Sequence, residues 1–502
     1  MITVMKVTKQ FGTKQDWDGK QVTILGAARQ GVALARYLLR HGARVVLNDI
    51  RPMEEMYASQ SSLDDLTREE SSRLVWVCGS HPFSVLDGTE LICISGGVPL
   101  TLNLVVEARR RGIRLSNDSQ IFLQATPCRV IGITGSAGKT TTTTLVGRIA
   151  EAGYRIMAAR PKGRYSGRIW IGGNIGTPLI THLDSMKPPD LAIMELSSFQ
   201  LEIMDVAPQV AAVLNVTPNH LDRHASMQDY LSAKGHILDY QQSENIAILG
   251  RDDPGAWLLA DRVKGKLISF GMSELTPDQD GTFYDQGTIY LRASHQLLGE
   301  EAGKLPKDLP VLRRSEIQLR GEHNLLNVLA ACAITYAAGL PIESIPAGIA
   351  GFTGVSHRLE FIRIWGSAAW YNDSIATAPE RVIAAIHSFE EPLILILGGR
   401  DKNLSWTELA TLVSQRVKHL IVFGEAVDKI IAAMDSAKSQ ESAIAIVSTT
   451  HCSGLKEAVL AAARIVEPGD VVLLSPGGTS FDEFHDFEER GECFVQLVNE
   501  LP

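Results

Sequence analysis

The chain has 502 residues, which is enough for about three domains of typical size. Its hydrophobic content of 45% and charged content of 21% are ordinary for a soluble globular protein. The formal net charge of −9 argues against a nucleic-acid partner, because such partners favour a basic surface.

The cysteines and the N-terminal segment indicate where the protein works. The six cysteines are scattered and form no C-x-x-C pair, which favours reduced thiols in a cytoplasm over a structural zinc site. Residues 1–20 are polar and mixed in charge, so they do not resemble a secretory signal. No apolar stretch is long enough to cross a membrane. We therefore expect a cytoplasmic protein without a membrane span.

The chain begins with a pattern typical of a dinucleotide-binding domain. Residues 21–26 predict a strand, residues 32–41 a helix and residues 43–48 a second strand, closed by Asp49. The glycine fingerprint is degraded, with alanine at position 28 between Gly26 and Gly31. The pattern predicts a doubly wound domain and leaves open whether it binds NAD, another nucleotide or none.

A second glycine-rich turn lies between a predicted strand at residues 128–133 and a predicted helix at residues 142–150. This layout, with Lys139 and Thr140 at the helix start, is typical of a phosphate-binding loop. Lys139 can reach the β- and γ-phosphates, and the Thr140 hydroxyl can bind Mg²⁺. The first glycine lies one place earlier than in the usual spacing, so a plain turn beside a surface lysine is the alternative.

Further strands follow at residues 191–195, 210–215 and 246–249, and polar side chains come at the ends of the first two. Glu195 and the Thr140 hydroxyl could share one Mg²⁺, and His220 could hold a second cation. Lys234 becomes a metal ligand only when it is neutral and carbamylated. Residue types alone favour the interpretation of Lys234 as an exposed lysine on a helix. They leave open whether His220 binds a cation.

The remaining segments complete the predicted fold class, α/β with three domains. Residues 278–310 are polar, with an alternating stretch that predicts a small antiparallel excursion, and a hinge is expected near 351–355. We predict an N-terminal Rossmann-like domain at 1–120 and a central ATP-binding domain with a mainly parallel sheet at 121–354. Residues 355–502, with strands near 369–372, 393–397, 419–422 and 471–474, form a C-terminal Rossmann-like domain.

Several stretches of the chain resemble motifs of the Mur ligases, ATP-dependent ligases that extend the peptide of a bacterial cell-wall precursor. They are Thr134-Gly135-Ser136-Ala137-Gly138-Lys139-Thr140, Gly172-Gly173-Asn174-Ile175-Gly176, Glu195-Leu196-Ser197-Ser198-Phe199-Gln200, Asn215-Val216-Thr217-Pro218-Asn219-His220, Gly321-Glu322-His323-Asn324 and His357-Arg358-Leu359-Glu360. Within the family, Glu-Leu-Ser-Ser-Phe-Gln and the C-terminal Ser480, Phe481 and Phe487 resemble the branch that adds D-glutamate.

The resemblance implies a role for each matching residue. The catalytic residues would be Lys139, His220 and Lys234. Those in contact with ATP would be Gly135, Ser136, Ala137, Gly138, Lys139, Thr140, Thr141, Asn324, Asn327, Arg358 and Asp373. Two Mg²⁺ ions would be held by Thr140, Glu195, His220 and carbamylated Lys234. A UDP-sugar site would be formed by Arg29, Gln30, Asp49, Arg51, Gly97 and Asn174, and a glutamate site by Thr377, Lys402, Ser480, Phe481 and Phe487.

The implied reaction is ATP-dependent addition of D-glutamate to UDP-N-acetylmuramoyl-L-alanine through an acyl phosphate. These small molecules would be the partners of a monomer that binds no nucleic acid. Ile375 stands where many relatives carry a lysine near the incoming amino acid, so the same chemistry with L-glutamate is an alternative. A more distant alternative is a folylpolyglutamate synthase. Residues 20–118 argue against it, because such an enzyme should lack a nucleotide-binding domain at this position. A nucleotide-binding regulator without ligase activity is disfavoured by the poor glycine fingerprint.

Overall fold

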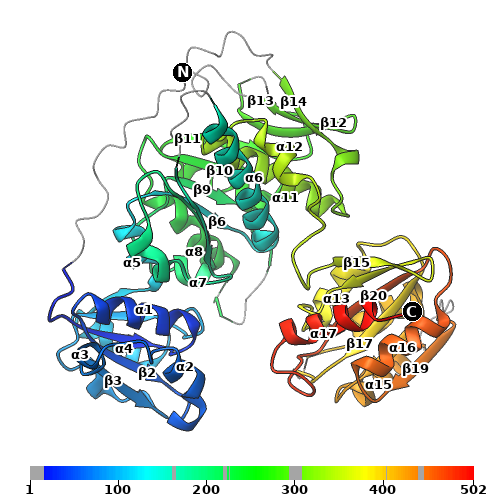
Figure 1. Cartoon of the computed structure of the whole chain (residues 1–502), viewed down its shortest axis with the longest axis horizontal. Coiled ribbons are helices and arrows are strands. Elements are labelled where there is room, and N and C mark those ends of the chain that lie inside the picture. The colour runs from blue at the N-terminus through cyan, green and yellow to red at the C-terminus, as the bar shows by residue number, and fades with distance from the viewer. Residues whose placement is uncertain are drawn as a thin grey trace. The chain divides into compact units, whose positions relative to one another are not determined.

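The computed structural model describes residues 16–160, 166–218, 223–224, 226–276, 278–292, 308–402, 404–438 and 446–502, with Lys438 described in its backbone only. Two compact units make up the chain (Figure 1). Unit 1 comprises Met1–Ile317 and His323–Ala350, and unit 2 comprises Gln318–Glu322 and Gly351–Pro502. The expected hinge coincides with the division at Gly351, whereas the assignment of Gln318–Glu322 to unit 2 was not predicted. A separate N-terminal domain stays a prediction.

The first sheet of unit 1 has five parallel strands in the order β3-β2-β1-β4-β5. Its strands are β1 (Gln21–Leu25), β2 (Arg44–Asp49), β3 (Leu74–Cys78), β4 (Leu91–Ile94) and β5 (Arg114–Ser116). The helices of this region are α1 (Arg29–Arg40), α2 (Tyr57–Ser61), α3 (Arg68–Ser71), α4 (Asn103–Arg110) and α5 (Asp118–Ala125). The predicted strand–helix–strand unit is confirmed. Strand β3 was not predicted, and none of its side chains is fully buried.

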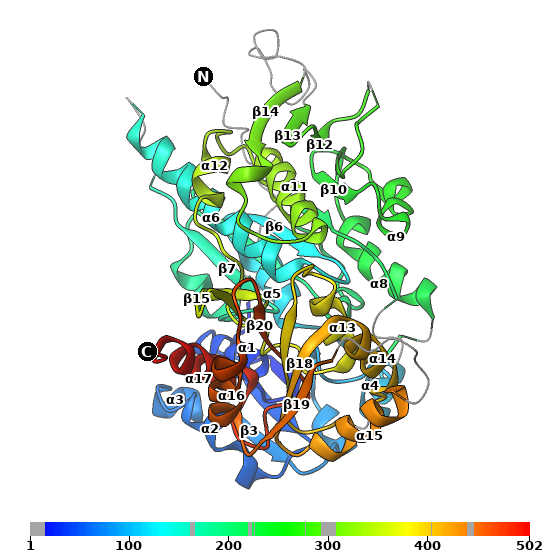
Figure 2. The ribbon, with the colours of Figure 1, turned by 90° about the vertical axis from the view of Figure 1, so that its right-hand side faces the viewer.

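The second sheet of unit 1 has the order β14-β13-β12-β11-β10-β9-β6-β8-β7. Its strands are β6 (Arg129–Thr134), β7 (Ile169–Gly173), β8 (Leu191–Glu195), β9 (Val210–Val213), β10 (Ile246–Gly250), β11 (Lys266–Phe270), β12 (Gly281–Asp285), β13 (Thr288–Arg292) and β14 (Asp308–Arg313). Pairing is antiparallel only from β12 to β14, at one edge of the sheet (Figure 2). This confirms the predicted parallel sheet with a small antiparallel excursion and puts β6 in its interior.

Helix α6 (Lys139–Ala159) follows β6 and is longer than predicted. It packs against α12 (Ser344–Ile349), where a Cβ on Gly348 would lie 2.5 Å from Ile149 Cα. The other helices of this region are α7 (Ser198–Leu201), α8 (Met227–Asp239), α9 (Pro254–Trp257) and α11 (Glu322–Ala337). Within the described part of the chain, no helix combines the length and hydropathy of a membrane span.

The described residues of unit 2 form a sheet in the order β15-β16-β20-β17-β18-β19, and among these strands only β15 is antiparallel to its neighbour. Its strands are β15 (Glu360–Trp365), β16 (Ala368–Asn372), β17 (Leu393–Gly398), β18 (Val417–Phe423), β19 (Ser448–Cys452) and β20 (Val471–Gly477). The helices are α13 (Pro379–Ile386), α14 (Thr407–Arg416), α15 (Val427–Lys438), α16 (Leu455–Ile465) and α17 (Phe487–Asn499). The loop after β16 therefore lies at the carboxyl end of an interior strand, where such sheets bind ligands.

Candidate active site

The turn between β6 and α6 is held in shape by hydrogen bonds to its own backbone. The Ala137 N–H donates to the Asn215 Oδ1 at 2.8 Å, and the Asn215 amide donates back to the Ala137 carbonyl at 3.2 Å. Lys139 Nζ donates to the carbonyls of Gly135 and Ser136, at 2.8 Å and 3.4 Å. The loop thus places a lysine and the amino end of a helix around one point, the geometry of a phosphate site.

Gly138 can be only glycine without rearrangement of this loop. Its φ is +79°, and an added Cβ would lie 2.1 Å from the Asn327 Oδ1. Asn327 in turn accepts from the Thr142 hydroxyl at 3.3 Å and donates to the Asn324 Oδ1 at 3.1 Å. The structure therefore brings two of the predicted ATP contacts on α11 to the phosphate loop. Thr141, another predicted contact, is buried in the first turn of α6.

A chain of hydrogen bonds runs from the phosphate loop toward α1. The Glu195 carboxylate, 2% exposed at the end of β8, accepts from the Thr140 hydroxyl at 2.9 Å and from the Asn174 amide at 3.1 Å. Next to Asn174, the Gly173 carbonyl accepts from the Gln30 side chain at 3.3 Å. Hydrogen bonds thereby connect the predicted metal ligands, Thr140 and Glu195, with Asn174, a predicted UDP-sugar contact.

The pair of Thr140 and Glu195 fits one Mg²⁺ ion. Both side chains offer oxygen atoms, which Mg²⁺ prefers, and the hydroxyl and carboxylate oxygens lie 2.9 Å apart. Among the described residues no group of three His, Cys, Asp or Glu side chains could hold a metal ion. Further ligands would therefore come from phosphate and water, as is usual for Mg²⁺. His220 lies outside the described residues.

Lys234 on α8 is 1% exposed, so the interpretation as an exposed surface lysine is wrong. Its Nζ lies 4.6 Å from the centre of the Tyr230 ring, and the Tyr230 hydroxyl is 3.0 Å from the Ser136 Oγ of the phosphate loop. Burial lowers the Lys234 pKa well below its usual value, and the charge of Lys139 lowers it further against the opposing effect of Glu195. The structure thus favours a neutral amine beside the phosphate loop.

At the end of β2, Asp49 is a structural clamp as well as a predicted uridine contact. It accepts from the Ala27 N–H at 2.8 Å, and from the Arg51 guanidinium at 3.0 Å and 2.9 Å. Burial would raise the Asp49 pKa, but the hydrogen bonds from Arg51 and Ala27 prevail and hold that pKa at about 2. Arg29 is exposed at the start of α1, and Gly97 lies in a turn after β4 with open space around it.

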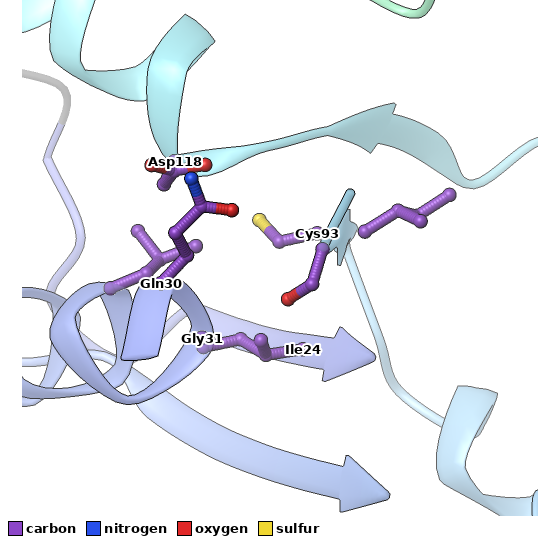
Figure 3. A pocket seen from close by; sticks show the side chains of 8 residues that line it. Ile24, Gln30, Gly31, Cys93 and Asp118 are labelled. Atoms are coloured by element: carbon purple, nitrogen blue, oxygen red, sulfur yellow. The ribbon is translucent and has the colours of Figure 1, made fainter. Parts of the chain in front are cut away.

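Figure 3 shows a small pocket in which the side chains of Gln30 and Asp118 lie next to each other, with Cys93 nearby. Asp118 is 6% exposed, and burial raises its pKa to about 6 although hydrogen bonds from the Ser119 amide and the Gln200 side chain oppose this. Asp118 was not among the site residues predicted from the sequence. It begins α5 and lines the same pocket as Gln30, whose side chain donates to the Gly173 carbonyl.

In unit 2, Asp373 follows β16 in a nearly closed environment. Its carboxylate accepts from the Ser475 hydroxyl at 2.8 Å and from the Leu359 N–H at 3.3 Å. Burial raises the Asp373 pKa to about 7, and the Ser475 hydrogen bond and the charge of Arg358 only partly oppose this shift. Arg358 and Asp373, two predicted ATP contacts, are therefore neighbours.

The predicted glutamate residues are gathered only in part. Lys402 Nζ donates to the Thr377 hydroxyl at 3.2 Å. Ser480 is 2% exposed, whereas the Phe481 side chain is 59% exposed. Phe487 begins α17 and packs edge-on against His357, with ring centres 6.3 Å apart. Thr377 and Lys402 are thus the pair that the structure brings into direct contact.

Comparisons with known proteins identify the family. The family described as Mur ligase middle domain matches residues 133–335, and the one described as Mur ligase, glutamate ligase domain, matches residues 357–478. A UDP-N-acetylmuramoylalanine–D-glutamate ligase of Geotalea uraniireducens is 36% identical over 96% of this chain and 98% of its own length. The chain belongs to the Mur ligase family. A ligase of the same name from Pelotomaculum thermopropionicum is 35% identical, over 97% of this Mur ligase and 99% of its own length.

Solved structures agree on the fold. The UDP-N-acetylmuramate-alanine ligase MurC of Thermotoga maritima, 18% identical, matches 95% of this Mur ligase and 99% of its own chain with a TM-score of 0.54. MurF from Acinetobacter baumannii, also 18% identical, matches 97% of this chain and 92% of its own with a TM-score of 0.53. These matches support a mixed α/β fold and carry no further argument about substrates.

Proposed function

We propose that this Mur ligase joins D-glutamate to UDP-N-acetylmuramoyl-L-alanine at the expense of ATP. The observation that carries the proposal is the match over nearly full length to ligases named for this reaction. The phosphate loop with Lys139, and the Thr140–Glu195 pair beside it, supply the parts that phosphoryl transfer requires. A MurF structure of the same fold, from Thermotoga maritima, is described as a complex with ADP.

ATP would supply the phosphoryl group that converts the substrate carboxylate into an acyl phosphate, which the glutamate amine then attacks. The chain's own residues bind and orient the substrates. The loop N–H groups and Lys139 hold phosphate oxygens, and Thr140 and Glu195 hold Mg²⁺. Asn324, Asn327, Arg358 and Asp373 contact the nucleotide. Lys139 would lie at the transferring group, where positive charge stabilises the transition state.

The UDP-sugar would bind at Arg29, Gln30, Asp49, Arg51, Gly97 and Asn174, in a domain of residues 1–120. Support comes from the hydrogen bonds that connect Gln30, Gly173, Asn174 and Glu195, because the reacting carboxylate must lie close to the transferred phosphoryl group. Domains at 121–354 and 355–502 would bind ATP and the amino acid. We expect a cytoplasmic monomer.

We further propose that Lys234 is carbamylated and, with His220, holds a second Mg²⁺. The lowered pKa of Lys234 supports this, since only the neutral amine reacts with CO₂. Lys234→Ala should lose roughly 100-fold or more of kcat, and short carboxylic acids such as acetate should restore part of it. The control is Lys187→Ala, which removes an exposed lysine. Its kcat should equal that of the wild type and should not change when acetate is added. Absence of rescue over a wide range of acid concentrations would contradict carbamylation.

Phosphate release tests the proposed function directly. The full chain is incubated with ATP, Mg²⁺ and UDP-N-acetylmuramoyl-L-alanine, and either D-glutamate or L-glutamate is added in separate reactions. Release that requires D-glutamate is the expected result. Release only with L-glutamate would retain the ligase chemistry and reassign the amino acid. No release with either would overturn the proposal, and steady ATP hydrolysis without any amino acid would favour a regulator.

A further inference from the structure

Two basic side chains contact the same short loop after β16. Arg381, an exposed residue of α13, donates from Nη1 to the Ile375 carbonyl at 3.3 Å. Lys402 donates to the Thr377 hydroxyl at 3.2 Å. Because Ile375 and Thr377 are separated by one residue, both cationic groups approach one end of the sheet.

A third cation also contacts this loop, but its hydrogen bonds are made to groups of the protein itself. Arg490 on α17 is fully buried and donates to the Ser374 carbonyl at 2.8 Å, the Ser374 hydroxyl at 2.9 Å and the Gly478 carbonyl at 3.2 Å. It therefore fixes the backbone of the loop. Its charge still acts on Lys402, whose pKa is lowered by burial and by the charges of Arg381 and Arg490, with partial opposition from Glu380.

Other cations near this end of the sheet are neutralised. Arg400 forms an ion pair with Glu425 at 2.7 Å, and Lys429 pairs with Asp401. Within the part of the chain that the structure describes, the ion pairs with an N–O distance of at most 4.0 Å include neither Arg381 nor Lys402. Cations gathered without a carboxylate in direct contact still repel one another, and an anion bound between them removes that cost.

We propose that Arg381 binds a carboxylate of the incoming amino acid, together with Lys402. The proposal rests on the proposed function, in which the amino acid is glutamate and brings two carboxylates. The family resemblance implied only one cation at this site, Lys402, and Ile375 on the neighbouring loop brings no charge. The guanidinium of Arg381 provides the second positive charge at the same loop, in a fork shape that suits a carboxylate.

The test compares Arg381→Ala, Arg381→Lys and Arg464→Ala in the full chain. Arg464→Ala is the control, because it removes an exposed arginine on α16. Loss of one charged hydrogen-bond partner predicts a rise of roughly tenfold in KM for D-glutamate in Arg381→Ala. The KM for ATP and the kcat should stay within about twofold of the wild type. Arg381→Lys should give an intermediate KM, since it keeps the charge without the fork.

Moving the positive charge from position 381 to position 375 distinguishes a role of Arg381 in binding from a role in folding. Ile375→Lys, added to Arg381→Ala, should recover much of the lost affinity for D-glutamate, which a purely structural role of Arg381 would not allow. An unchanged KM for D-glutamate in Arg381→Ala, or an equal rise in KM for ATP, would overturn the role of Arg381. A wild-type chain that releases no phosphate with D-glutamate would instead overturn the proposed function, and this inference would be lost with it. If Arg381→Ala unfolds, Arg381→Lys decides the question, because it keeps the positive charge and its KM for D-glutamate should still rise while its KM for ATP does not.

Discussion

The phosphate loop after β6 and the loop after β16 both follow the carboxyl end of an interior strand, yet they are held by opposite means. The phosphate loop is shaped by glycine and by hydrogen bonds of Asn215 to its backbone. The loop after β16 is shaped by buried polar and charged side chains. Asn372 donates to Glu360 and to the Gly491 carbonyl, and Arg490 donates to the Ser374 carbonyl.

The difference separates two ways of preparing a site for an anion. Backbone N–H groups and a helix end need no counter-charge of their own, so the phosphate loop is complete before ATP binds. A loop built on buried charged groups carries electrostatic stress, which shows in the raised pKa of Asp373 and the lowered pKa of Lys402. Variants of the first loop should therefore act through catalysis and shape, and variants of the second through charge.

The largest effect is expected from Lys139→Ala. Removing the cation that is proposed to face the transferred phosphoryl group should lower kcat by about 10³-fold or more. Phosphate release measures kcat, and binding of UDP-N-acetylmuramoyl-L-alanine by calorimetry should persist. Lys187→Ala, at an exposed lysine of the same unit, is the control. Full activity of the Lys139 variant would remove the phosphate loop from the mechanism.

Gly138→Ala should reduce stability and ATP binding together. The new Cβ would lie 2.1 Å from the Asn327 Oδ1 at a φ of +79°, so we expect a loss of roughly 2–4 kcal/mol in the free energy of unfolding. Gly176→Ala is a matched control, because its φ is +57° and nothing lies within 4 Å of the added Cβ. It should cost about 1 kcal/mol from backbone strain alone. Equal losses in chemical denaturation would show that the contact with Asn327 is unimportant.

The same contrast explains how far the sequence could predict the site. The strand, glycine-rich turn and helix around Lys139 and Thr140 were predicted correctly, because these residues are adjacent in the chain and flanked by a regular strand and helix. The burial of Lys234 was not predicted. A lysine on a helix does not show by its type which face it occupies, and only the packing of α8 places this one inside. Resemblance to a family implied its role, but residue type alone suggested the surface.

In unit 2 the important partners are distant in sequence. Arg490 reaches Ser374 across 116 positions, and Asp373 meets Ser475 across 102 positions. Such pairs depend on the order of strands in the sheet, which local patterns do not specify. Arg381 was missed for a different reason, because an arginine early in a short amphipathic helix is usually a solvated residue. The strands β16, β17, β18 and β20 were nevertheless predicted, as their continuous apolar runs are typical of parallel sheets.

The smallest effect expected is a change in the pH dependence of stability, and it has opposite signs in the two units. Asp373 has a pKa of about 7 in the folded chain against an ordinary value of 3.8, so the folded state binds more protons and stability falls as pH rises between these values. Asp373→Asn should be more stable than the wild type at pH 8 by roughly 2–3 kcal/mol, with no difference at pH 4.

Asp49→Asn is the counterpart in unit 1. The pKa of Asp49 is held at about 2, so its ionised form stabilises the fold above its ordinary pKa of 3.8, and that contribution is lost as pH falls through about 2. The Asn variant should therefore be less stable than the wild type at pH 8. Denaturation of Asp373→Asn at pH 4 and pH 8, and of Asp49→Asn at pH 8 and about pH 3, measures the contrast, because each pair of conditions spans the range in which that carboxyl titrates. If Asp373→Asn also lost stability at pH 8, hydrogen bonding of the ionised carboxylate would outweigh its burial, and the two loops would be electrostatically alike.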